Sequence, residues 1–552
     1  MTIMTGGDAL AAQLIHEGVD QIFGLPGVQL DFAVDGLAKV QDRVKFLHVR
    51  HEQTTAYMAD GYARSTGKVG VAMFVPGPGL FNAMAGLSTA WACSSPVLAI
   101  CGQIQSNAIG KGYGLLHEVN GQSDTLATVT KWSAMARAPQ EIPGLVREAF
   151  HQLRTGRPRP VGIEVPPDVL QAQADITLCD PVDEALRVVH PDAAEVKHAA
   201  ELLRHAKRPV IWAGWGVQNA NATGELTALA ERLQAPVCTS NNGRGAIPSD
   251  HPLALDGLAS RALFPLADVV IVVGSRFMGS AGVLSARAPD ARFIYINADE
   301  HDFAAPRAVS AQLHADAKTA LADLLAELDG LAARPSAAPD CDKLRAWCHE
   351  QYAGVEPQYT LLKALRNAIP RDGILVNEMT QVGYVSRQTY PVYAPRTFIT
   401  PGWQGTLGFG YPTALGVAAG NPEKAVVSIN GDGGFGFGLA ELATARQHDL
   451  NCVAVVFNDK AYGNVKRLQQ QQFNRTLGSD LRNPDFVKVA EAFGVPAIRV
   501  HSADALEGAL RSALAARGPH LIEMPVDEMP NPAHLMSESA KPPFPAPPNP
   551  LL

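Results

Sequence analysis

The sequence predicts an α/β protein with three doubly wound parallel-sheet domains. Short apolar segments that are typical of strands alternate with helical patterns along most of the 552 residues, as in a parallel sheet covered by helices. At ~100 to 200 residues per domain, this length fits about three domains. The clearest single unit covers residues 425–446, where an apolar segment, a glycine-rich turn and a helical pattern follow one another.

The first predicted domain spans residues 1–185, with a Pro166-Pro167 pair after its strand and helix patterns. Its clearest strand segments are residues 21–24, 69–74 and 96–101. The second predicted domain spans residues 190–335 and repeats the same rhythm, with strand segments at residues 209–214, 236–239, 269–274 and 293–297. Both blocks therefore predict a parallel sheet with helices on its faces.

The alternation of strand and helix segments ends after the second predicted domain. Residues 336–357 contain a Pro/Ala-rich stretch and a short polar helix, which predicts a surface linker. The third domain, residues 358–529, contains strand segments at 373–377, 425–430 and 452–459. A Pro-rich tail, residues 530–552, is expected to lie over the surface or to close a cleft.

Composition excludes several classes of partner. The net charge is -8 and only 18% of residues are charged, without a basic block, so we expect no nucleic acid and no anionic membrane surface as partners. No apolar stretch approaches the ~20 residues that span a bilayer, and the N-terminus lacks signal-peptide features, which predicts a cytoplasmic location. The seven cysteines are scattered and predict reduced thiols. Small molecules are the expected partners.

A glycine-rich turn, Gly431-Asp432-Gly433-Gly434, lies between a predicted strand and a predicted helix. In open α/β sheets, ligands bind beyond the carboxyl ends of strands, where the next helix offers N–H groups to a phosphate. Asp459 ends the next predicted strand, so two carboxylates are expected side by side. Carboxylates held together with phosphates suit Mg²⁺, and the turn therefore predicts a metal-bridged diphosphate.

The same turn also fits a dinucleotide fingerprint. Gly431, Gly433 and Gly436 have the G-x-G-x-x-G spacing, and Asp459 follows at the distance of a ribose-binding acid. An NAD-dependent dehydrogenase is therefore an alternative from a different class. It is disfavoured because the charge of Asp432 would face a pyrophosphate with no cation between them.

The turn and the Asn458-Asp459 pair together resemble the signature of the thiamine-diphosphate enzymes. The resemblance implies that the side chains of Asp432 and Asp459 and the backbone carbonyl of Ala461 bind Mg²⁺. Asp459 replaces the commoner Asn, which adds a negative charge and leaves the preference among metals open. Thr380 and Gln381, just after a predicted strand, are candidates for holding the diphosphate together with the backbone of Gly433 and Gly434. Tyr462 and Gly463 are further candidates for binding the cofactor.

A second motif of the same family lies in the first domain. Arg50-His51-Glu52 and a following Ala-Asp-Gly-Tyr-Ala-Arg ending at Arg64 resemble the segment whose Glu hydrogen-bonds the aminopyrimidine ring. Glu52 would begin a helix beneath apolar residues, where a carboxyl group is poorly hydrated and its pKa rises. The resemblance implies that Glu52 helps the cofactor to lose a proton. In the third domain, Gly405 and Leu407 resemble the segment that contacts the aminopyrimidine and bends the cofactor.

Residues expected near the substrate lie in loops of the first domain. Gln103 resembles a glutamine that faces the reaction centre in acetolactate synthases, and Gln29 is a similarly placed polar residue expected near the thiazolium ring. His117 stands where aldehyde-releasing decarboxylases carry two histidines. The missing second histidine favours ligation over simple decarboxylation. In the central domain, Gly243–Gly245 and Gly274–Arg276 weakly resemble FAD- or CoA-binding segments, but the stretch after Pro252 is short, so no FAD is expected.

The resemblance covers the whole chain and implies an N-terminal pyrimidine-binding domain, a central dinucleotide-binding-like domain and a C-terminal diphosphate-binding domain. The expected function is acetolactate-synthase-like: thiamine-diphosphate- and Mg²⁺-dependent decarboxylation of a short 2-oxo acid, with pyruvate as the first choice, and carboligation to an acceptor carbonyl. A non-ligating decarboxylase, a hydroxyketone or 2-hydroxyacyl-CoA lyase and a silent binding protein stay open. The family also implies a homodimer or homotetramer with active sites at the subunit interface.

Overall fold

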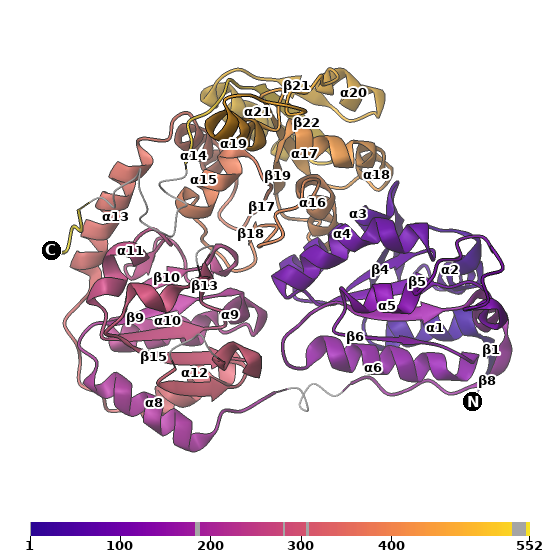
Figure 1. Ribbon diagram of the computed structural model, residues 1–552, viewed down its shortest axis with the longest axis horizontal. Helices are drawn as coiled ribbons and strands as arrows, with labels where there is room; N and C mark the ends of the chain where they lie inside the picture. The colour runs from indigo at the N-terminus through magenta and orange to yellow at the C-terminus, as the bar shows by residue number, and fades with distance from the viewer. Residues whose placement is uncertain (1, 183–187, 280–281, 305–308, 533–547) are drawn as a thin grey trace.

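The computed structural model describes residues 2–182, 188–279, 282–304, 309–532 and 548–552. Within them lie three six-stranded sheets whose strands are all parallel to their neighbours. The sheets follow one another along the chain and form three lobes (Figure 1). In each sheet the strand order reverses direction beside the first strand of the unit, so the predicted fold class is confirmed.

The N-terminal sheet has the order β3-β2-β4-β5-β7-β6. Its strands are β2 (Gln21–Gly24), β3 (Lys45–His48), β4 (Gly70–Phe74), β5 (Val97–Gly102), β6 (Trp132–Met135) and β7 (Val161–Val165). The larger helices of this lobe are α1 (Gly6–His16), α2 (Asp31–Ala38), α3 (Glu52–Thr66), α4 (Pro78–Cys93) and α6 (Ile142–Arg154). A short antiparallel pair, β1 (Thr2–Thr5) with β8 (Gln173–Ile176), joins the two ends of the lobe.

The central sheet has the order β11-β10-β9-β12-β15-β16. Its strands are β9 (Pro209–Ala213), β10 (Val237–Thr239), β11 (Ala254–Leu255), β12 (Val269–Val273), β15 (Arg292–Asn297) and β16 (Ala311–His314). The helices of this lobe include α8 (Ala193–His205), α9 (Trp215–Asn219), α10 (Thr223–Leu233), α11 (Ser260–Leu263) and α12 (Ala317–Glu327).

The C-terminal sheet has the order β18-β17-β19-β20-β22-β21. Its strands are β17 (Ile374–Asn377), β18 (Phe398–Ile399), β19 (Val426–Gly431), β20 (Val453–Asn458), β21 (Ala497–Arg499) and β22 (His520–Pro525). Its helices are α14 (Gln358–Ala368), α15 (Gln381–Thr389), α16 (Gly410–Gly420), α17 (Asp432–Phe435), α18 (Leu442–Gln447), α19 (Gly463–Phe473), α20 (Phe486–Ala492) and α21 (Ala503–Ala516).

The segment expected to be a surface linker carries the helix α13 (Ala338–Tyr352). One face of this helix is buried in the core of the central lobe, through Cys341, Leu344, Trp347 and Cys348. The segment therefore packs as part of the protein core. Of the Pro-rich tail, residues 533–547 lie outside the described part of the chain, and the end beyond them contacts the central lobe through a hydrogen bond from Asn549 to the carbonyl of Ala262.

The N- and C-terminal lobes meet where α3 packs closely against α16. A Cβ atom on Gly416 would lie 2.0 Å from the carbonyl oxygen of Met58, and one on Gly61 would lie 2.2 Å from that of Thr413. Only glycine permits two helix backbones to approach so closely. Because α3 begins at Glu52, this contact places a predicted catalytic residue relative to the C-terminal lobe.

A buried arginine joins all three lobes. Arg64 is fully buried, pairs with Asp60 at 3.3 Å, and donates to the carbonyl of Thr400 in the C-terminal lobe at 2.8 Å. It also donates to Asn242 of the central lobe at 3.4 Å. Burial raises the pKa of Asp60 and the charge of Arg64 opposes that rise, so each charge depends on the other.

We predict that Arg64→Leu destabilises the protein by about 3–5 kcal/mol, because it leaves the Asp60 carboxylate buried without its counterion. The measurement is the shift of the urea unfolding transition. Arg517→Leu, which breaks an exposed pair with Glu423, is the control and is expected to change stability by less than about 1 kcal/mol. Equal shifts for the two variants would contradict the importance of the buried pair.

Candidate active site

A cavity of about 340 Å³ opens in the C-terminal lobe, at the carboxyl ends of β17, β19 and β20. The structure brings together there all the cofactor-binding residues that the sequence predicted in this lobe. They are Thr380, Gln381, Gly405, Leu407, Asp432, Gly433, Gly434, Asp459, Ala461, Tyr462 and Gly463. The strand order explains this gathering, because β17 and β19 flank the point at which the sheet reverses.

The glycine turn after β19 forms a close-fitting part of the cavity wall. A Cβ atom on Gly433 would lie 2.6 Å from the ring of Tyr462, and one on Gly434 would lie 2.5 Å from the carboxyl group of Glu378. Side chains are therefore excluded at both positions, which lets a ligand approach the backbone at the start of α17. This geometry fits a phosphate group better than a bulky apolar ligand.

Asp432 and Asp459 lie side by side at the edge of the cavity. Asn483 donates a hydrogen bond of 2.5 Å to Asp432, and Asp459 accepts one of 3.1 Å from the backbone of Ala461. Burial raises the pKa of both carboxyl groups, and burial together with the charge of Asp432 raises the pKa of Asp459 to about 6. A divalent cation between the two carboxylates would relieve this repulsion.

Glu52 lies in the N-terminal lobe, at the first position of α3, and does not line this cavity. Its carboxyl group accepts a hydrogen bond of 2.9 Å from Asn82 of α4. The side chain is half-buried, so within a single chain it is less shielded from water than the sequence predicted.

The predicted substrate-side residues lie in the segments that follow β2 and β5 of the N-terminal lobe: Gln29 after β2, and Gln103 and His117 after β5. Gln29 donates a hydrogen bond of 3.1 Å to the carbonyl of Leu116, the residue before His117. The carbonyl oxygen of His117 packs against Gly77, at 2.4 Å from where a Cβ atom on that glycine would be. Gln29 and His117 are thereby held near each other.

Gln103 has both ends of its amide engaged inside the lobe. It donates to Glu164 at 3.1 Å and accepts from the N–H of Ile104 at 2.8 Å. Glu164 also accepts a hydrogen bond of 2.7 Å from the side-chain nitrogen of Gln122. The side-chain oxygen of Gln122 accepts a hydrogen bond of 2.8 Å from the N–H of Gly77. Gln103 is therefore fixed by a buried network, and its predicted contact with substrate stays a prediction.

Two residues of the C-terminal site were missed by the sequence analysis. Glu378 follows β17 directly, just as Asp432 follows β19, so an acidic residue at the end of a predicted strand was the available signal. Asn483 holds Asp432 and, at 3.0 Å, the side-chain oxygen of Asn458. It lies in a loop remote in sequence, and no local pattern marks it.

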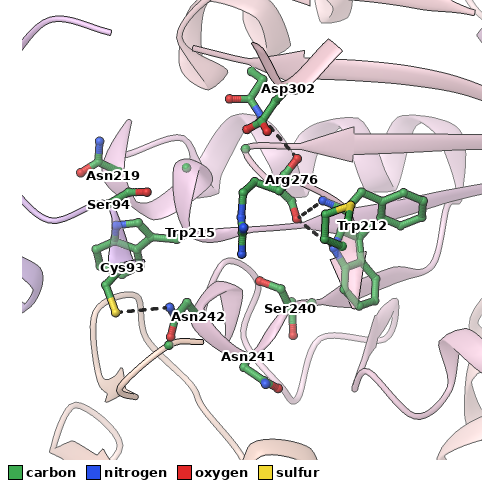
Figure 2. A pocket seen from close by; sticks show the side chains of 18 of the residues that line it. Cys93, Ser94, Trp212, Trp215, Asn219, Ser240, Asn241, Asn242, Arg276 and Asp302 are labelled. Carbon is green, nitrogen blue, oxygen red and sulfur yellow. Dashed lines mark hydrogen bonds between the residues drawn. The ribbon is translucent and has the colours of Figure 1, made fainter. Parts of the chain in front are cut away.

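A second and larger cavity, of about 850 Å³, lies where the central lobe meets the other two. Figure 2 shows the Arg276 side chain within it, with Trp212 and Trp215 on either side in this view. Met379 and Gly405 line both this cavity and the smaller one, so the two spaces adjoin. The expectation that no FAD binds in the central lobe stays a prediction.

Three domains of one known enzyme family match the three lobes of the chain. Residues 4–127 match the thiamine pyrophosphate enzyme N-terminal TPP binding domain, residues 196–324 match the central domain, and residues 378–524 match the C-terminal TPP binding domain. The chain belongs to the thiamine-pyrophosphate enzymes. A thiamine pyrophosphate binding domain therefore replaces the dinucleotide-binding alternative for the C-terminal lobe.

Within this family the chain resembles acetolactate synthases. It is 34% identical to the probable acetolactate synthase large subunit of Methanocaldococcus jannaschii, over 95% of this chain and 92% of the relative. It is 31% identical to the acetolactate synthase isozyme 3 large subunit of Escherichia coli, over 93% of both chains. It is also 34% identical to the probable 2-ketoarginine decarboxylase AruI of Pseudomonas aeruginosa, over 94% of both chains. The protein is thus a carboligating or decarboxylating enzyme.

None of the helices in the described ranges is both long and apolar enough to cross a membrane. Those ranges also hold no group of three or more His, Cys, Asp or Glu side chains that could bind a metal ion by themselves. A metal at Asp432 and Asp459 would therefore need further oxygen ligands from amides, backbone or a bound phosphate.

We predict that Asp459→Asn raises the thermal stability of the ligand-free protein at pH 7.5. The substitution keeps the oxygen that accepts from Ala461 and removes one of two carboxylates that repel each other. Differential scanning calorimetry measures the change. Asp480→Asn, which removes an exposed ion pair with Lys466, is the control and should leave the unfolding temperature nearly unchanged. A lower unfolding temperature for Asp459→Asn would refute the prediction.

Proposed function

We propose that the protein is a thiamine-diphosphate- and Mg²⁺-dependent enzyme that decarboxylates a short 2-oxo acid, with pyruvate as the expected donor, and joins the product to an acceptor carbonyl. The observation that carries this proposal is the cavity in which Asp432 and Asp459 lie beside the Gly433-Gly434 turn. The acetolactate synthase relatives support the reaction class.

The residues of the cavity fit the cofactor and its metal. Asp432 and Asp459 supply hard oxygen donors for Mg²⁺, and the carbonyl of Ala461 is available on the same wall. The backbone of Gly433 and Gly434 can approach a diphosphate because no side chain is tolerated there. Leu407 exposes 37% of its surface at the cavity and offers an apolar support for the rest of the cofactor.

When bound, thiamine diphosphate supplies the nucleophilic carbon that adds to the 2-oxo group and allows CO₂ to leave. The chain contributes binding, orientation and proton transfer around it. Glu52 would hold a proton at its carboxyl group for exchange with the aminopyrimidine. Gln29, Gln103 and His117 would bind or orient the substrate, with Gln103 kept in place by Glu164.

We further propose that the active site is completed by a second copy of the chain, in a homodimer or homotetramer. Glu52, Gln29, Gln103 and His117 are absent from the wall of the cavity that would hold the diphosphate. Large apolar side chains are exposed on elements around both groups of residues, as is typical of an unpaired protein interface. They include Phe81, Leu116, Trp403, Phe437, Val465, Leu468, Phe473 and Leu477.

A non-ligating decarboxylase is the second candidate. It is favoured by the relative named as a probable 2-ketoarginine decarboxylase, whose identity to this chain equals that of the archaeal acetolactate synthase relative. A lyase that cleaves hydroxyketones or 2-hydroxyacyl-CoA compounds uses the same cofactor chemistry. These candidates differ in what traps or protonates the product of decarboxylation.

The reaction is tested by CO₂ release and product mass for the purified protein with thiamine diphosphate, Mg²⁺ and a panel of 2-oxo acids, with and without aldehyde acceptors. The panel includes pyruvate and 2-oxo acids with a cationic end. Formation of acetolactate or a coupled hydroxyketone supports the proposal. Release of free aldehyde alone, even with acceptors present, would support the decarboxylase instead.

We predict that Glu52→Gln lowers kcat by about 10²–10⁴-fold, because a neutral amide cannot exchange the proton that the cofactor requires. The affinity for thiamine diphosphate, measured by calorimetric titration, should change little. Glu148→Gln, in a half-buried i,i+4 pair with Gln152 on α6, is the matched control and should retain wild-type kcat. Unchanged kcat in Glu52→Gln would remove Glu52 from the reaction.

We also predict that two inactive variants restore activity when their subunits mix. Co-expression of Glu52→Gln with Asp432→Asn would give dimers in which one site carries both defects and the other carries neither. For a two-fold symmetric dimer with random pairing, about a quarter of wild-type activity is expected. Activity that stays at the level of the separate variants would show that each chain holds a complete site.

A further inference from the structure

Glu378 is a buried carboxyl group in contact with the loop that precedes α16. It is 1% exposed and accepts a hydrogen bond of 2.6 Å from the N–H of Gly408. Gly408 has a φ of +80° and follows Leu407, the apolar residue at the cavity. Glu378 thus fixes the backbone of the loop, residues 405–408, that contributes Gly405 and Leu407 to the candidate site.

The same carboxyl group also touches the glycine turn. A Cβ atom on Gly434 would lie 2.5 Å from one carboxyl oxygen of Glu378 and 2.8 Å from the other. The N–H of Glu378 donates 3.2 Å to the carbonyl of Ile429 on β19, so its backbone is held by the strand that leads into this turn. Glu378 therefore lies between the loop 405–408 and the turn 432–434, which form two different parts of the cavity wall.

The surroundings of Glu378 favour a neutral acid. Burial raises its pKa to about 8, against hydrogen bonds from the backbone of Gly408, Gly410 and Phe409. On the helices that pack against Glu378, burial together with the charge of Glu378 raises the pKa of Tyr57 on α3 and of Tyr384 on α15. The nearby turn carries Asp432. None of these is a cation.

A proton on Glu378 would also satisfy a second buried atom. Oε2 of Glu378 and Oδ1 of Asn430 both lack a hydrogen-bond partner among the described residues. They lie 3.1 Å and 2.4 Å from the place of a Cβ on Gly410, so both face the start of α16. An O–H on Glu378 directed toward Asn430 would pair two acceptors that otherwise carry a desolvation penalty.

We propose that Glu378 is a positioning residue that fixes the spacing between the loop 405–408 and the turn 432–434, and thereby holds the two ends of thiamine diphosphate at the separation the cofactor needs. The inference rests on the proposed function, because it takes the loop to contact the aminopyrimidine and the turn to contact the diphosphate. Glu378 itself touches neither substrate nor cofactor.

The test compares two probes that differ in how much of the site they occupy. Thiamine diphosphate with Mg²⁺ spans the loop and the turn, whereas inorganic pyrophosphate with Mg²⁺ reaches only the turn. Glu378→Ala removes the buried hydrogen bond from Gly408 and the side chain that separates the loop from the turn. It should weaken thiamine diphosphate binding by about tenfold or more, and pyrophosphate binding by clearly less. Calorimetric titration of the full-length protein measures both affinities. No loss, or an equal loss for both probes, would overturn the inference.

Glu378→Gln supplies the rescue, because its amide accepts from Gly408 and donates toward Asn430 as the neutral acid would. It should bind thiamine diphosphate within about threefold of wild type, since both hydrogen bonds are kept. Binding as weak as that of Glu378→Ala would overturn the inference. Should Glu378→Ala not fold, Glu378→Asp shortens the spacer by one methylene, and the same comparison of the two probes decides.

Glu17→Ala is the matched control for general loss of stability. Glu17 is also buried, at 3% exposure, and pairs with Arg154 in the N-terminal lobe, away from the cavity. This variant should lower the unfolding temperature while both affinities stay at wild-type values. Weaker binding in Glu17→Ala equal to that in Glu378→Ala would reduce the effect to stability and overturn the inference. Wild-type protein that fails to bind thiamine diphosphate would instead overturn the proposed function.

Discussion

The close packing of α3 against α16 is the contact on which both groups of candidate site residues depend. Two glycines, Gly61 and Gly416, allow the helix backbones to approach until only a hydrogen atom fits between them. The helix α3 begins at Glu52, and α16 begins directly after the loop that carries Leu407. A single contact therefore sets the position of Glu52 and of the loop 405–408 in each chain. Arg64, on the same helix, extends this rigidity to the central lobe.

Much of the C-terminal site could be predicted from the sequence, because parallel strands end at a common edge. Once residues 425–430 and 452–459 are predicted as neighbouring parallel strands, Asp432 and Asp459 are expected to lie close together. The engagement of Gln103 with Glu164 could not be predicted, since the two residues are 61 positions apart and nothing local links them. The packing of α13 had a signal that was overlooked: Cys341, Leu344 and Cys348 recur at helical spacing, which indicates a buried face rather than a linker.

We expect the candidate site to lower the stability of the ligand-free protein through two neighbouring carboxyl groups. Asp432 and Asp459 are partly desolvated and face each other, which raises the pKa of both. Such an arrangement persists only because the surrounding strands and Asn483 hold it, and a bound cation with a diphosphate would convert the repulsion into attraction. The same repulsion would favour a metal-bound anion as the ligand proposed above, since a neutral ligand would leave the two carboxylates uncompensated.

Three acidic residues occupy equivalent places in the C-terminal sheet but differ in how deeply they are buried. Glu378, Asp432 and Asp459 each follow the end of a parallel strand, at the same edge. Asp432 and Asp459 line the cavity, where solvent or a cation can reach their oxygens, and they suit ligation. Glu378 does not line the cavity, and its buried carboxyl group accepts a hydrogen bond from the backbone of Gly408. Burial raises its pKa to about 8, which favours the neutral acid. An acidic residue placed directly after one of these strands therefore lies at the candidate site. The burial of its carboxyl group then determines whether it is suited to bind a metal or to support the cavity wall.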